Sequence, residues 1–166
     1  YNFDGGNENL TQVGTADAIT LEDDFTIGFA IKVAEADVAN LVTIADASSA
    51  DDFIRLKNTE QIEVKADGQL RTVDLNAGLP NGDPVGIVIT RTSDSMRLYV
   101  DGVAQTDTAI FSSGKALDID TVGCRNSQIN DFIGDIGQII IYSCAEMSTV
   151  NAVIDTIDDT RVQMIQ

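Results

Sequence analysis

The sequence contains no histidine and no tryptophan, and only two cysteines and two prolines among its 166 residues. Histidine is the most frequent general base in enzymes and the most frequent protein ligand of transition metals. Its absence excludes Ser-His-Asp and Cys-His catalysis, together with any zinc site that needs a histidine ligand. The absence of tryptophan removes the largest ring on which a protein can stack a sugar.

Basic residues are also scarce. Ten Lys and Arg stand against 27 Asp and Glu, which gives a formal net charge of −17. Proteins bind nucleic acids through basic surfaces that displace counterions from phosphates, so the sign of the charge excludes this class of partner. Binding to an anionic membrane surface is excluded for the same reason. A charge of this sign favours divalent cations.

Long apolar runs are missing as well. No stretch approaches the ~18 apolar residues that a membrane helix needs, so membrane insertion is excluded. No segment has the pattern of a secretion signal, but the sequence begins at Tyr1 rather than methionine, so a removed leader stays an open alternative. The length fits one domain over residues 1–166, because no linker or repeat divides it.

Alternation of apolar and polar residues dominates the sequence, and this period of two is typical of half-buried strands. The clearest run is 25–33, where every second residue from Phe25 to Val33 is apolar. Runs 85–90 and 136–142 are mostly apolar, which predicts strands buried on both faces. Further strands are predicted around 41–44, 54–57, 62–65 and 96–100.

Asp-Gly pairs separate several of these runs. Asp67-Gly68 and Asp101-Gly102 each lie between two alternating segments. The tight turn that matches strand twist needs positive φ, which this pair adopts readily, so both positions predict hairpins. About twelve short strands and one terminal helix predict an antiparallel sandwich of two sheets.

The one predicted helix spans about 148–158. Ser148 is a suitable N-cap, and Val150, Val153 and Ile157 follow at the spacing of an apolar helical face. The acidic residues at 158–159 oppose the helix dipole, so we expect the helix to fray there. The short tail 159–166 is expected to pack either on the domain or on a neighbouring subunit.

Three blocks of sequence, in this order, resemble a known family: residues 1–5 with 24–27, residues 89–91 with 98–102, and residues 132–136 with 139–142. They are similar to the opening strands, the "lYvDG" hairpin and the closing strand of laminin-G-like, concanavalin-A-like jelly rolls, including pentraxin-like bacterial and phage members. The resemblance implies an all-β fold: a two-sheet antiparallel jelly-roll sandwich with one short C-terminal helix. It also implies sugar binding as the common activity, with metal and ligand sites on loops at one rim.

Calcium is the cofactor that the acidic loops suggest, because it takes six to eight oxygen ligands. The candidate ligands are Asp51, Asp52, Asn126, Asn130 and Asp131. The alternative is that they are solvated turn residues of an acidic protein.

Aromatic rings are the second kind of candidate, because a sugar stacks its apolar face on a ring. Phe53 and Phe111 border loops, and Tyr99 is expected to be exposed from its place in the alternation. These three are the candidate ligand-binding residues. The rings in the framework strands are predicted to be core.

No catalytic residues are predicted. Related glucanases carry two or three acids at alternate positions of one strand, and glycoside hydrolysis needs two carboxylates facing one cleft. Asp118 and Asp120 do alternate, but they are expected to face solvent from a half-buried strand. The two cysteines, Cys124 and Cys144, are expected to end tens of ångströms apart, beyond the ~7 Å Cα limit of a disulfide. Two free thiols would favour folding in a reducing cytoplasm.

The sequence therefore favours a non-catalytic structural or adhesive module on a virion surface, such as a phage capsid decoration or fibre protein. Its partners would be capsid or fibre subunits. The alternative is a secreted, extracellular, calcium-dependent lectin module that binds cell-surface glycans. A glycoside hydrolase is the second alternative.

Overall fold

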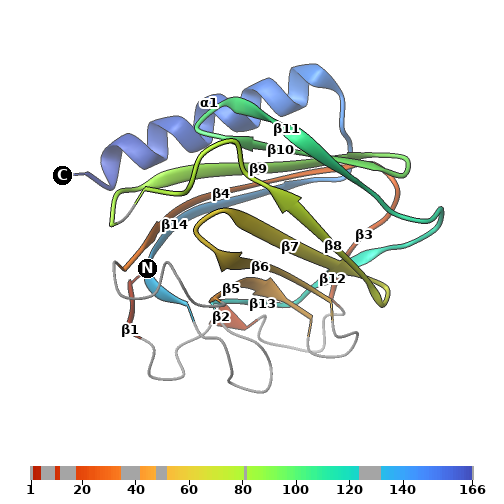
Figure 1. The fold of residues 1–166 in the computed structure, drawn as a ribbon, viewed down its shortest axis with the longest axis horizontal. Coiled ribbons are helices and arrows are strands. Elements are labelled where there is room, and N and C mark those ends of the chain that lie inside the picture. Colours follow the sequence, from red (N-terminus) through yellow and green to blue (C-terminus); the bar gives the residue numbers. More distant parts are fainter. Residues whose placement is uncertain are drawn as a thin grey trace.

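Two six-stranded antiparallel sheets lie face to face in the computed structural model, and one helix lies outside the first sheet (Figure 1). The structure describes residues 2–4, 10–11, 18–34, 42–47, 52–80, 82–123 and 132–165. This architecture confirms the predicted two-sheet jelly roll with a C-terminal helix. Among the described residues, no helix has the length and apolar character to cross a membrane.

The first sheet has the strand order β1-β14-β4-β9-β10-β11. Its strands are β1 (Asn2–Asp4), β14 (Ile133–Tyr142), β4 (Phe25–Val33), β9 (Val85–Thr92), β10 (Ser95–Val100) and β11 (Val103–Ile110).

The second sheet has the order β2-β13-β5-β6-β7-β8, and a separate pair joins β12 to β3. The strands are β2 (Leu10–Thr11), β13 (Thr121–Val122), β5 (Val42–Asp46), β6 (Phe53–Asn58), β7 (Gln61–Ala66), β8 (Gln69–Asp74), β12 (Leu117–Ile119) and β3 (Ile19–Leu21).

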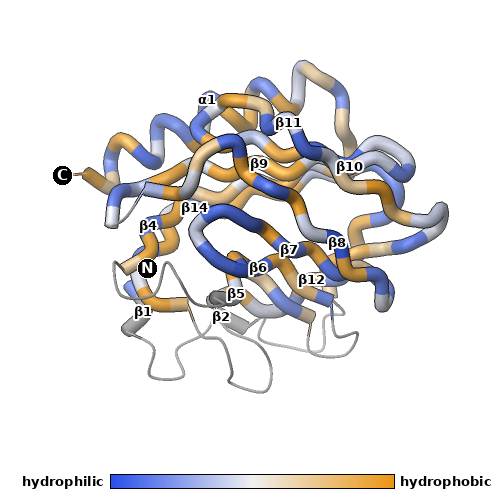
Figure 2. The backbone as a smooth tube through the Cα atoms, in the orientation of Figure 1, coloured by the Kyte–Doolittle hydropathy of each residue, from blue (hydrophilic) through white to orange (hydrophobic). Residues whose placement is uncertain are grey.

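The main core fills the space between the sheets. The apolar residues of β4 that alternate from Phe25 to Val33 all lie in it, as the sequence predicts. They face inward residues of β6 and β7, among them Ile54, Leu56 and Ile62. The tube of β4 is largely orange in Figure 2, whereas the tip of the β6–β7 hairpin is blue. Burial between two sheets is what stabilises the sandwich.

Both predicted Asp-Gly hairpins are confirmed. Asp67 and Gly68 have φ angles of 45° and 78° and connect β7 to β8. Asp101 and Gly102 have φ angles of 47° and 74° and connect β10 to β11. Two successive residues at positive φ match the right-handed twist of the flanking strands.

The prediction of two strands buried on both faces is half right. Residues 85–91 of β9 are all buried, but between Ile136 and Tyr142 only Ile136 is. In the described structure, β1 pairs only with residues 133–135 of β14. The part of β14 after residue 135 therefore has one described neighbouring strand, β4. The register of β14 also shifts between Ile136 and Ile139, which marks an irregularity such as a β-bulge in this strand.

The helix α1 (Met147–Gln163) begins one residue before the predicted start and ends five residues after the predicted end. Glu146, not Ser148, occupies the N-cap. The expected fraying near 158–159 is wrong because Arg161 compensates the acidic charge there. Its Nε lies 3.5 Å from Asp158 Oδ1 and 3.2 Å from Asp101 Oδ1. Most of the predicted tail is therefore helical.

Glycines let α1 lie directly on the first sheet. A Cβ atom at Gly28 of β4 would lie 2.6 Å from Val153 Cγ1. A Cβ atom at Gly86 of β9 would lie 2.9 Å from Ile157 Cγ2. Contacts this close leave no room for a side chain, so the glycines set the distance between helix and sheet.

Replacing Gly28 with alanine is expected to destabilise the fold by about 1–3 kcal/mol, because the new methyl group would force Val153 out of its packing. Urea denaturation measures the free energy of unfolding. Gly78→Ala is the matched control, since a Cβ atom there would meet its nearest neighbour, the Thr59 carbonyl oxygen, at an ordinary 3.5 Å. Equal stability losses in both variants would contradict this account of the helix contact.

Candidate functional site

The three aromatic candidates are buried. The exposed fractions of Phe53, Tyr99 and Phe111 are 3%, 8% and 2%. The expectation that Tyr99 is exposed is wrong, because Tyr99 packs with Val150 and Val153 of α1 in a second apolar cluster. Alternation places Tyr99 on the outer side of β10 correctly, but it does not show that a helix covers that side.

Arginine side chains lie against two of these rings. The guanidinium carbon of Arg55 lies 4.3 Å from the centroid of Phe53. Those of Arg71 and Arg91 lie 5.5 Å and 5.2 Å from the centroid of Phe111. Cation–π contacts of this kind hold the arginines in place. The rings of Phe53 and Phe111 are therefore buried and in contact with arginine side chains, so neither has an exposed face on which a sugar could stack.

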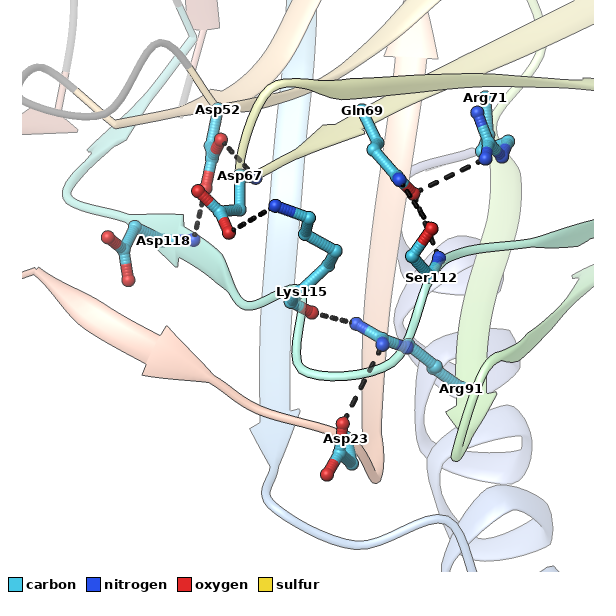
Figure 3. A network of polar contacts seen from close by, with 9 residues as sticks. All are labelled: Asp23, Asp52, Asp67, Gln69, Arg71, Arg91, Ser112, Lys115 and Asp118. Atoms are coloured by element: carbon cyan, nitrogen blue, oxygen red, sulfur yellow. Dashed lines mark hydrogen bonds and ion pairs between the residues drawn. The ribbon is translucent and has the colours of Figure 1, made fainter.

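Asp52 is the one predicted calcium ligand among the described residues; Asp51, Asn126, Asn130 and Asp131 lie outside them. The side chain of Asp52 is buried at the start of β6. Its Oδ1 accepts a hydrogen bond from the backbone N–H of Asp67 at 2.8 Å, and its Oδ2 accepts one from that of Asp118 at 3.0 Å (Figure 3).

Asp52 therefore ties the β7–β8 turn to β12. Burial raises its pKa above the ordinary value of 3.8, and the carboxylates of Asp118 and Asp67 add to the rise. The two backbone hydrogen bonds act in the opposite direction. The structure therefore gives the Asp52 carboxylate a structural role. Calcium binding by the five candidate residues stays a prediction.

Figure 3 shows that the Asp52 carboxylate is part of a larger network of polar contacts. Lys115 Nζ lies 2.9 Å from Asp67 Oδ2, and the Lys115 carbonyl accepts a hydrogen bond from Arg91. Arg91 is fully buried, and its Nη2 lies 3.7 Å from Asp23 Oδ1. The network joins loops of both sheets at one rim of the sandwich, so its residues hold the fold together.

A second group of polar residues lies on the outer face of the second sheet, on β6, β7 and β8. Glu63 of β7 is 4% exposed although it points away from the core. Arg55 Nη2 lies 2.6 Å from Glu63 Oε2, and Thr72 donates a hydrogen bond to Glu63 Oε1 at 3.4 Å. Lys57 Nζ lies 3.6 Å from the same oxygen. These basic residues are thus occupied by a carboxylate of the chain itself.

Two shallow pockets open at the rim, with volumes of about 240 and 360 Å³. Exposed Glu22 and Asp23 line both, Asp24 and Ser143 line the larger one, and Gly114 lines the smaller. Within the part of the chain that the structure describes, no three acidic or cysteine side chains are placed to hold a metal ion. The carboxylates of Glu22, Asp23 and Asp24 can accept hydrogen bonds from the hydroxyl groups of a ligand in these pockets.

The edge strands β8 and β11 close one side of the sandwich, and we call their contact the seam. The backbone N–H of Asp74 donates to Asp107 Oδ2 at 2.8 Å, and that of Asn76 donates to Gln105 Oε1 at 2.7 Å. In return, the backbone N–H and the hydroxyl of Thr106 donate to Asn76 Oδ1 at 3.0 and 2.7 Å. Side chains of each edge thus satisfy the backbone of the other.

The seam opens beyond Asn76 into a pocket of about 280 Å³, which we call the seam pocket. It is lined by Asn76, Ala77, Gly78, Pro80, Val100, Asp101, Val103 and Gln105. This pocket is not predictable from the sequence, because residues 76–80 and 100–105 are brought together only by the packing of the two sheets. The single local signal is the run of polar residues in β11, which is typical of an edge strand.

Cys144 has a free thiol, and its Sγ lies 3.4 Å from Thr149 Oγ1. Cys124 lies outside the described residues, so the expected pair of free thiols stays a prediction. Asp118 and Asp120, the alternating acids, accept hydrogen bonds from Thr20 and Thr121 respectively.

Comparisons with known proteins agree with the fold. The laminin G type model of the concanavalin A-like lectin/glucanases superfamily matches residues 4–148. Among curated proteins, none matches the sequence.

Several solved structures are similar over most of the chain. A heptameric SAP-like pentraxin from Limulus polyphemus is 11% identical, with a TM-score of 0.59 over 90% of this chain and 72% of that one. Domain 4 of an extracellular arabinanase from Geobacillus stearothermophilus, in complex with arabinotriose, is 16% identical, with a TM-score of 0.63 over 87% and 69%. A putative carbohydrate binding protein from Bacteroides ovatus is 16% identical, with a TM-score of 0.60 over 88% and 43%.

Replacing Asp52 with asparagine is expected to destabilise the fold by about 1–3 kcal/mol, because the amide N–H₂ would face a backbone N–H that now finds an acceptor. The pKa of Asp52 is raised in the folded state, so protonation of its carboxyl group stabilises the fold below pH 3.8. This stabilisation is lost as the pH rises through the folded-state pKa.

The stability difference between the native chain and Asp52→Asn should therefore shrink as the pH rises above 3.8. Urea denaturation at a series of pH values measures it. Asp83→Asn, at an exposed position, is the control and should give a small difference at every pH. A difference that widens with pH would refute this reasoning.

Proposed function

Because the chain belongs to the concanavalin A-like lectin/glucanases superfamily, we propose that it is a non-catalytic, lectin-like module that binds neutral glycans. Two of the similar structures support a sugar ligand by their descriptions: a putative carbohydrate binding protein and a domain in complex with arabinotriose. At 16% identity, these similarities support the fold alone. The choice of ligand therefore rests on this chain's own surface.

The observation that carries the proposal is the lining of the three described pockets. Carboxylates, amides, hydroxyls and small or aliphatic residues line them, and none of the three has a basic lining residue. Such groups accept and donate hydrogen bonds to sugar hydroxyls. The carboxylates among them repel sulfate, carboxylate and phosphate groups, and the net charge of −17 adds to that repulsion.

The alternating acids support a non-catalytic role. A glycosidase needs two carboxyl groups aimed at one bond from opposite sides. Asp118 and Asp120 instead accept hydrogen bonds from threonine hydroxyls of the chain. Asp52, whose pKa is raised in the folded state, is also structural, because its buried carboxylate accepts hydrogen bonds from two backbone amides.

A second candidate is a structural or adhesive module on a virion surface, with capsid or fibre subunits as partners. The observation that favours it is the exposure of Met147, Val162 and Ile165 near the two ends of α1, where a protein partner would cover them. Genes for capsid and tail proteins next to the gene of this chain would support this candidate. A neighbourhood of secreted or cell-surface proteins would count against it.

An array of immobilised glycans tests the proposed function. Neutral glycans should give signals at least about tenfold above those of sulfated, sialylated or uronate-containing glycans, which corresponds to ~1.4 kcal/mol of discrimination. Repeating the array with EDTA tests the predicted calcium requirement. Binding that survives EDTA would assign the glycan to protein groups alone, whereas a blank array, or a preference for anionic glycans, would refute the proposal.

A further inference from the structure

The seam pocket differs from the two rim pockets in the chemistry of its walls. Glu22, Asp23 and, in the larger one, Asp24 dominate the rim pockets. The seam pocket combines an aliphatic wall of Pro80, Val100 and Val103 with the polar residues Asn76, Asp101 and Gln105. A pyranose ring has an apolar C–H face and a rim of hydroxyls, so it needs both kinds of wall.

The polar groups of the seam pocket are held in place before any ligand arrives. Asn76 takes part in hydrogen bonds to Gln105 and Thr106, and Gln105 Nε2 also donates to the Val103 carbonyl at 2.8 Å. Asp101 Oδ1 accepts the backbone N–H of Gly86 at 2.8 Å and lies 3.2 Å from Arg161. Fixed walls reduce the entropy that binding costs.

The aliphatic wall is open to solvent at one residue. The side chain of Val103 is 61% exposed, at the first position of β11 after the Asp101–Gly102 turn. Covering it with the C–H face of a sugar would remove apolar surface from water, which is favourable in proportion to the area covered. The hydroxyls at the ring edge would then lie near the amide and carboxylate groups that also line the pocket.

Charge selects a neutral ligand here. The lining contains one ionisable residue, Asp101, and Arg161 beside it compensates that charge. The pocket therefore attracts neither an anion nor a cation strongly. Its volume of about 280 Å³ lies just below the ~300–1,000 Å³ typical of small-molecule sites. That size suits one sugar ring better than an oligosaccharide.

We propose that the seam pocket binds the terminal residue of a neutral glycan, with Val103 against the C–H face of the ring and Asn76, Asp101 and Gln105 near its hydroxyls. This inference rests on the proposed lectin-like function and names the site at which it acts. Since a single ring buries little surface, we expect a dissociation constant of about 1 mM for a monosaccharide.

The test compares two variants of the same strand. Val103→Glu places a charge against the aliphatic wall, whereas Ile110→Glu places the same charge at a position of similar exposure, 65%, outside the pocket. Both positions are exposed, so both variants should fold. Saturation-transfer NMR and amide chemical shifts are measured with neutral monosaccharides, chosen from the terminal residues of the glycans bound on the array.

The expected result is that Val103→Glu weakens binding at least tenfold, while Ile110→Glu binds like the native chain. Amide shifts on titration should centre on residues 76–78 and 100–105. A bound monosaccharide whose affinity is the same in both variants, with shifts elsewhere, would overturn the seam pocket and leave the proposed function intact. An array on which no glycan binds would overturn both.

Discussion

The contact between α1 and the glycine-lined face of the first sheet determines which surfaces of this molecule are closed. Gly28 and Gly86 leave no space between the helix and strands β4 and β9. The second apolar cluster, which includes Tyr99 and Val150, forms only because the helix lies this close. The outer side of β4, β9 and β14 that α1 covers is therefore structural, and the pockets among the described residues lie at the rim and at the seam.

Several of the few basic residues make contacts within the protein, although the chain carries a large excess of negative charge. Arg91 is buried between the Lys115 carbonyl and Asp23, and Arg55 is held between Glu63 and the ring of Phe53. A chain of net charge −17 that uses its cations in this way presents carboxylates, amides and hydroxyls to solvent. The proposed preference for neutral glycans follows from that distribution, since repulsion at the surface excludes acidic sugars.

The sequence predicts the fold well where the signals are local. The alternation in residues 25–33 identifies β4 and its core face, and the Asp-Gly pairs identify two hairpins, because both patterns depend on neighbouring residues only. Alternation cannot show which outer face receives a helix, and this is why Tyr99 was expected to be exposed. It also cannot show that a carboxylate such as Asp52 is occupied by two distant backbone amides, or that Asn76 meets Gln105 across two sheets.

The hydrogen bonds of the seam have a consequence for how copies of this chain behave at close quarters. An exposed strand edge is a template onto which a strand of another molecule can add. At β8 and β11, the backbone amides of Asp74, Asn76 and Thr106 are already bonded to side chains of the facing edge. Copies crowded side by side on one surface would keep their sheets separate along this edge, so a dense layer of the module resists fusing into a shared aggregate.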